Sequence, residues 1–271
     1  MPDNDIPRQL PAAAGLAWLK TGFALYRKNP LLLTAGTTIF FVAMLLLGII
    51  PYVGQVLSEL ATPIFVAGFM AAFRALDEGE ELELPHFFAG FTNKPQQLAV
   101  VGAVYLLLSI LIAWVALRLG FNPKALMEAA SAGDKINPQD AQHLLQTTLP
   151  ILLLTLVLLI PIGMATWFAV PLIFFGGAGP FQALAISFKA SWKNWLAFTV
   201  FGLLGFLIWT VAVILLGILA YVLGPLTGIF FLLLLLMSWS LLFATIYTSY
   251  QAVFAIWQGE DHASSAPEFS L

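Results

Sequence analysis

Phe23-Ala-Leu-Tyr-Arg-Lys-Asn-Pro30 stands directly before the first long apolar run of the chain. Similar stretches precede two later apolar runs, at Phe88-Ala-Gly-Phe-Thr-Asn-Lys-Pro95 and at Phe188-Lys-Ala-Ser-Trp-Lys-Asn-Trp195. Each begins with Phe, contains another aromatic residue, and has adjacent Lys and Asn before a Pro or Trp; we call these three stretches the feet. Because aromatic and cationic side chains gather at membrane–water interfaces, the feet predict three points where the chain enters a bilayer.

The composition supports a membrane protein. The 271 residues are 61% hydrophobic and only 9% charged, whereas soluble domains are roughly 45–50% apolar and about 25% charged. Cysteine is absent, which excludes disulfides and thiolate metal sites. The net charge of -3 suggests no nucleic-acid partner, since such proteins usually carry a basic patch.

The apolar runs are long enough for transmembrane helices, which need about 20 residues each. We therefore predict an all-α polytopic membrane protein with six transmembrane helices, arranged as three hairpins with amphipathic interfacial helices. One membrane domain is expected over residues 12–257, between a disordered N-terminus, 1–11, and a disordered tail, 258–271. The predicted spans are 31–52, 56–76, 98–119, 149–175, 196–223 and 226–257.

Two segments outside the spans carry helical patterns. Leu16, Leu19, Phe23 and Tyr26 share one helical face, which predicts an amphipathic helix over residues 12–29. This helix either lies in the headgroup layer or packs on the bundle as a lead-in helix. The polar loop 120–148 contains two short helical patterns, at 123–132 and 138–147.

The distribution of Lys and Arg predicts the orientation. With six spans, eight of these residues fall on the side of the feet and three on the other, so the feet and both termini are expected to be cytoplasmic. The eight are Arg8, Lys20, Arg27, Lys28, Arg74, Lys94, Lys189 and Lys193, and the three are Arg118, Lys124 and Lys135.

The feet also suggest an internal repeat of one foot and one helical hairpin. A unit with two crossings returns to its starting side, so three such units would be parallel and related by a pseudo-threefold axis along the membrane normal. This differs from the inverted repeats of many transporters. The alternative is that juxtamembrane segments in general collect aromatic residues, Lys and Asn.

The sequence offers little for catalysis. His86, His143 and His262 all lie outside the predicted spans, and no zinc-protease, nucleophile-elbow or P-loop motif is present. The acidic run 77–83 lacks the alternating spacing of a calcium loop and is expected to be solvated. We expect no enzyme activity, no cofactor and no metal.

Two sets of residues are candidates for binding. A polar stripe on the sixth span either lines a path for a solute or joins helices by hydrogen bonds, and we favour the second reading. The candidate polar lining is Ser238, Thr245, Thr248, Ser249 and Glu59. The feet provide candidate interfacial anchors, which either bind lipid headgroups or simply hold the chain at the interface. These anchors are Phe23, Lys28, Phe88, Lys94, Phe188 and Lys193.

Three motifs resemble those of a proteobacterial family of uncharacterised six-span inner-membrane proteins. Trp18 to Pro30 matches Trp-x-x-x-Gly-Phe/Trp-x-Leu-Phe/Tyr-x-x-Asn-Pro, and Pro63 to Ala75 matches Pro-x-x-x-x-Gly-x-x-x-Ala-x-Arg-Ala. Phe87 to Phe91 is similar to Leu-Phe-x-Gly-Phe, with Phe87 in place of Leu. More distantly, the chain is similar to the membrane domain of some glycerophosphodiester phosphodiesterases. The resemblance implies a bacterial inner-membrane location and carries over no catalytic residues.

We therefore expect a non-enzymatic inner-membrane protein that binds or organises lipids or partner proteins, with membrane lipids and other membrane proteins as its partners. The alternative is a transporter or channel for a small or amphipathic solute, with prolines as bends and the polar stripe as its lining.

Overall fold

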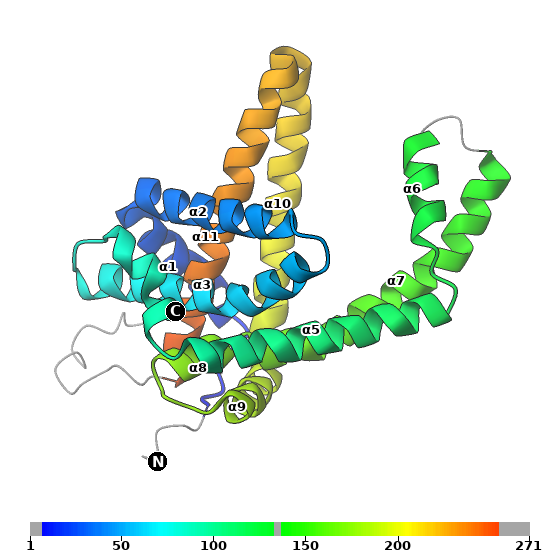
Figure 1. The fold of residues 1–271 in the computed structure, drawn as a ribbon. Helices are drawn as coiled ribbons and strands as arrows, with labels where there is room; N and C mark the ends of the chain where they lie inside the picture. The colour runs from blue at the N-terminus through cyan, green and yellow to red at the C-terminus, as the bar shows by residue number, and fades with distance from the viewer. Residues whose placement is uncertain (1–6, 133–136, 255–271) are drawn as a thin grey trace.

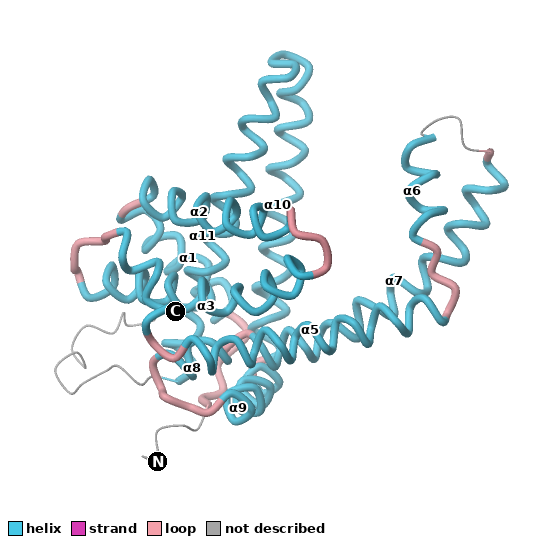
Figure 2. The backbone as a smooth tube through the Cα atoms, in the orientation of Figure 1, coloured by secondary structure: helices cyan, strands magenta, loops and turns pink. Residues whose placement is uncertain are grey.

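A computed structural model describes residues 7–132 and 137–254, and this part of the chain is helical without strands (Figures 1 and 2). The predicted tail and the first six residues lie outside the described residues. The longer helices are α1 (Ala14–Lys28), α2 (Pro30–Gly48), α3 (Val53–Glu78), α5 (Pro95–Arg118), α6 (Pro123–Ala132), α7 (Pro138–Thr166), α9 (Pro180–Lys193), α10 (Trp195–Leu223) and α11 (Thr227–Phe254). Short turns of helix are η2 (Leu84–Phe88), α4 (Ala89–Thr92), α8 (Ala169–Phe174) and η4 (Gly224–Leu226).

Proline and asparagine set the starts of several helices. Pro30, Pro95 and Pro180 each occupy the first turn of their helix, where the missing N–H costs nothing and the fixed φ favours helix. Asn29 ends α1 and accepts a hydrogen bond from the Leu32 N–H at 3.2 Å, so it caps α2. A foot is thus the junction at which a shorter helix stops and a long apolar helix begins. Helix α1 packs against α10 and α11, as expected for a lead-in helix on the bundle.

Three hairpins follow three foot segments along the chain. Helix α1 precedes the pair α2–α3, the short elements η2 and α4 precede α5–α7, and α9 precedes α10–α11. Figure 1 shows that the hairpins α5–α7 and α10–α11 leave a central cluster of helices in diverging directions, to the right and upward.

The prediction of an all-α polytopic membrane protein is confirmed. Five stretches are long and apolar enough to cross a membrane, and the fifth, Trp195–Phe254, contains both α10 and α11. These two helices are joined by η4 and lie side by side as a hairpin (Figure 1).

The structure differs from the predicted boundaries in three places. The predicted helix 138–147 continues into the fourth span as one helix, α7, which then breaks at Trp167 and Phe168 before α8. The first span ends at Gly48 instead of residue 52, because the next residues turn and Tyr52 adopts a φ of 61°. Residues 7–10, within the segment expected to be disordered, lie against the core, as described below.

The packed core lies where the feet and the inner halves of the hairpins meet. Its largest fully buried side chains include Phe69, Phe73, Phe168, Tyr247 and Tyr250. The outer halves of the hairpins are different, because large apolar side chains there are exposed; examples are Leu117, Leu149, Leu215, Ile218 and Val222. Surface of this kind is suited to contact with lipid.

Glycines allow the closest helix contacts inside this core. A side chain at Gly68 of α3 would overlap the carbonyl of Phe87, and one at Gly102 of α5 would overlap the carbonyl of Glu59. By contrast, a side chain at Gly217 of α10 would meet nothing within 4 Å. Small residues that let backbones approach closely are the usual means of joining membrane helices.

This difference yields a matched pair of variants. We expect Gly102→Leu to push α5 away from α3 and to lower the free energy of unfolding by about 1–3 kcal/mol, the usual cost of overpacking. Gly217→Leu adds the same atoms where there is room. Thermal unfolding of the purified proteins in detergent, followed by intrinsic fluorescence, should show a lower midpoint for the first variant only; equal midpoints would contradict this packing.

Candidate functional site

The lysines of the first two feet bind the ends of their own hairpins. Lys28 Nζ donates to the carbonyl of Leu76, in the last turn of α3, at 2.6 Å. Lys94 Nζ donates to the carbonyl of Ile173, near the end of α8, at 2.9 Å. The last carbonyls of a helix carry a partial negative charge, so a cation there stabilises the helix end. The Ile173 carbonyl also accepts from the Gly177 N–H at 3.2 Å.

At the third foot, the N-terminal segment and not the lysine donates to a carbonyl near the end of the described part of α11. Lys193 Nζ donates to the carbonyl of Pro7 at 2.9 Å, and the N–H of Arg8 donates to the carbonyl of Val253, in the last turn of α11, at 2.9 Å. Asn194 holds the same segment, because its Oδ1 accepts from the Leu10 N–H and its Nδ2 donates to the Arg8 carbonyl. We call residues 7–10 the strap.

The aromatic anchors take a different position from the lysines. Phe23, Phe88 and Phe188 are all exposed. Phe188 stacks on Trp192 one turn later in α9, with ring centroids 6.4 Å apart. In each foot, therefore, the first aromatic is exposed, while the lysine Nζ donates to a backbone carbonyl.

The structure places the polar stripe of α11 inside the core. Thr245, Thr248 and Ser249 are buried. Thr245 Oγ1 donates to the Leu241 carbonyl at 2.8 Å, and Thr248 Oγ1 donates to the Trp18 carbonyl at 3.2 Å. These hydroxyls join α11 to itself and to α1.

The other members of the predicted lining do not extend this stripe. Ser249 Oγ accepts from the indole Nε1–H of Trp167 at 3.1 Å, which ties α11 to the break after α7. Ser238 donates to the Leu234 carbonyl in its own helix. Glu59 lies near the outer end of α3 and accepts a long hydrogen bond from Gln55, one turn earlier, at 3.5 Å.

Several polar contacts of the core were not among the predicted residues. Ser240 of α11 and Thr37 of α2 share a hydrogen bond of 2.6 Å. Asp77, expected to be solvated, accepts from the Tyr247 hydroxyl at 3.0 Å and from Gln251. Ser240 lies outside the predicted stripe. Its partner Thr37 and the Asp77 partner of Tyr247 become apparent only from the placement of α2 and α3 around α11.

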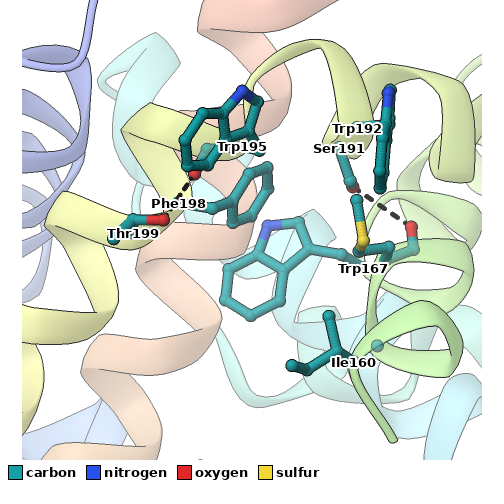
Figure 3. Close-up of a pocket in the computed structure, with 9 residues that line it drawn as sticks. Ile160, Trp167, Ser191, Trp192, Trp195, Phe198 and Thr199 are labelled. Atoms are coloured by element: carbon teal, nitrogen blue, oxygen red, sulfur yellow. Dashed lines mark hydrogen bonds between the residues drawn. The ribbon is translucent and has the colours of Figure 1, made fainter. Parts of the chain in front are cut away.

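A cavity of about 770 Å³ lies where α7 meets α9 and α10 (Figure 3). Three tryptophans, Trp167, Trp192 and Trp195, contribute to its wall. In the view of Figure 3 the rings of Trp192 and Trp195 stand on opposite sides, with Trp167 between them. Trp192 and Trp195 remain 67% and 57% exposed, so the cavity is open along its rim.

The two hydroxyls in the wall of this cavity have internal partners. Ser191 Oγ donates to the Met164 carbonyl at 3.1 Å, and Thr199 Oγ1 donates to the Trp195 carbonyl at 2.9 Å. The remaining wall is formed by apolar and aromatic groups. A cavity of this size and lining matches the usual range of about 300–1,000 Å³ for small-ligand sites and favours an apolar occupant.

Long apolar helices around a core of buried, internally hydrogen-bonded side chains define a polytopic integral membrane protein. A probable inner membrane protein of Burkholderia thailandensis is 31% identical over 205 residues, which cover 73% of this chain and 74% of the relative. The chain therefore belongs to the family of this bacterial inner membrane protein. No protein-family model matches the chain. No solved structure matches it either.

The lysine contacts predict a measurable effect on stability. We expect Lys28→Met and Lys94→Met each to lower the free energy of unfolding by about 1.5–3 kcal/mol, the usual range for a hydrogen bond to a charged group. Thermal unfolding in detergent tests this expectation.

Lys20→Met serves as the control, because Lys20 is exposed on α1 and no hydrogen bond or ion pair joins it to another described residue. If all three variants unfold at the same temperature, the foot lysines do not hold the hairpin ends.

Proposed function

We propose that this protein is a non-enzymatic lipid-binding and lipid-organising protein of the bacterial inner membrane. The observation that carries the proposal is the divergence of the hairpins α5–α7 and α10–α11 from a core that is closed at the feet (Figure 1). Their outer apolar faces are not covered by the described parts of the chain, so membrane lipid is the natural occupant of the space between them.

The arrangement of the chain ends supports six crossings with both termini in the cytoplasm. The strap meets the end of α11 at the Arg8–Val253 hydrogen bond, so the described chain starts and finishes at the same end of the bundle. An even number of crossings is required for this. The foot cations lie at that end, and the positive-inside rule assigns it to the cytoplasm.

The internal hydrogen bonding of α11 counts against the transporter or channel. A path for a polar solute needs polar groups that are free to bind it, and the hydroxyls of Thr245, Thr248 and Ser249 bind other parts of the core instead.

Exposed cations in and beside the feet make the proposal testable. Lys20, Arg27 and Lys189 are exposed and donate to none of the helix-end carbonyls described above. Each cation near a membrane surface contributes about 1 kcal/mol to attraction for anionic lipid. We expect the triple variant Lys20→Gln, Arg27→Gln, Lys189→Gln to lose most of the preference for phosphatidylglycerol over phosphatidylcholine.

Electron paramagnetic resonance of spin-labelled lipids around the reconstituted protein measures this preference. The matched control is Lys20→Arg, Arg27→Lys, Lys189→Arg, which keeps the charges and should keep the preference. A wild-type protein without any preference, or a neutral triple variant that retains it, would refute the proposed role of the feet.

A further inference from the structure

Helix α7 separates two apolar hollows. The first is the 770 Å³ cavity already described, which is lined in part by Ile160, Gly163 and Met164 of α7 and by Trp167, the residue that directly follows this helix. The second, of about 450 Å³, lies between α7 and α5, and α7 contributes Leu158, Pro161, Ile162 and Ala165 to it.

The two hollows lie on opposite faces of α7. The residues of each set are spaced by three or four positions, as expected for one face of a helix. The second set is shifted from the first by two residues, which is about 200° of rotation on an α-helix. Helix α7 therefore separates the two hollows.

Helix α9 bridges both hollows at their interfacial end. Phe188 lines the second hollow, and Trp192 lines the first. Their rings stack on one another with an interplanar angle of 19°. The stacked pair thus forms a ridge with one apolar hollow on each side of it.

Positive charge accompanies this ridge. Lys189 follows Phe188 directly and is exposed, and Lys193 follows Trp192 in the same way. No acidic residue occurs in α9 or α10, nor in α1, which packs against α10. An anionic group is therefore attracted to the end of the ridge, where Trp192 and Trp195 mark the interface.

We propose that α7 and α9 form a binding site for one anionic phospholipid with two acyl chains. One chain occupies each hollow, so that the lipid straddles α7, and the phosphate of the headgroup lies beside Lys189. This site deepens the lipid-binding role proposed above and rests on it. Two separate apolar slots fit a two-chain lipid better than a single-chain or polar ligand, because the wall hydroxyls of the first slot are already bonded to carbonyls.

Gly163 provides a direct way to fill the first hollow. A Cβ at Gly163 would meet nothing within 4 Å, and replacement of glycine within a helix favours the helical state. We expect Gly163→Leu to fold normally and to weaken binding of phosphatidylglycerol at least tenfold. Native mass spectrometry of the purified full chain, titrated with this lipid in detergent, measures the dissociation constant.

Two comparisons make the test specific. Gly217→Leu adds the same side chain to the open face of α10 and should bind phosphatidylglycerol like the wild type. Single-chain lysophosphatidylglycerol needs only one hollow, so Gly163→Leu should change its binding much less. Thermal unfolding of both variants checks that they remain folded.

Lys189→Gln tests the headgroup contact. We expect it to weaken phosphatidylglycerol binding about fivefold, from the usual contribution of one interfacial cation, and to leave phosphatidylcholine binding unchanged.

Equal phosphatidylglycerol affinity in the wild type and Gly163→Leu would overturn the site. If the spin-label preference for anionic lipid persisted in that case, the proposed function would stand without this site. Absence of both the bound lipid and the preference would refute both.

Discussion

The helix ends that meet in the core impose the constraint on which the rest of the structure depends. Each hairpin returns to the feet, where carbonyls near the helix ends need hydrogen-bond partners other than water. Lys28 and Lys94 donate directly to such carbonyls, at Leu76 and Ile173. The third end uses the strap, which Lys193 holds in place. A lysine therefore donates to a backbone carbonyl at each foot, directly at the hairpin end in the first two and through the strap in the third.

The hairpins are held together at the feet, and their outer parts diverge from one another (Figure 1). Inside the closure, the hydroxyls of α11 bind α1, α2 and Trp167, so this helix is joined to its neighbours without a row of open polar groups. Outside it, the faces of α5, α7 and α10 remain apolar and uncovered. The protein thus combines a packed base with apolar arms whose exposed faces suit contact with lipid, which is the physical basis of the proposed role.

The sequence was sufficient to predict the all-α membrane class, because this class depends on local composition and spacing. It singled out Lys28, Lys94 and Lys193 but not their carbonyl partners, since those partners are distant in sequence. The strap was missed for the same reason, as its contacts come from Asn194. Trp167 stands at the break after α7, where it contacts Ser249. The cavity beside Trp167 forms where three helices meet, and no local sequence pattern specifies that meeting.

The water accessibility of α11 shows directly whether the core excludes water where the hairpins meet at the feet. The chain has no native cysteine, so single cysteines can be placed along the stripe and treated in membranes with a water-soluble maleimide. The positions are Ser238, Leu241, Thr245, Thr248 and Ala252, with the exposed loop residue Glu81 as the labelled reference. We predict that Glu81→Cys reacts readily and that Thr245→Cys and Thr248→Cys do not. Reaction along the whole stripe would reveal a water-filled path through the core and contradict the account.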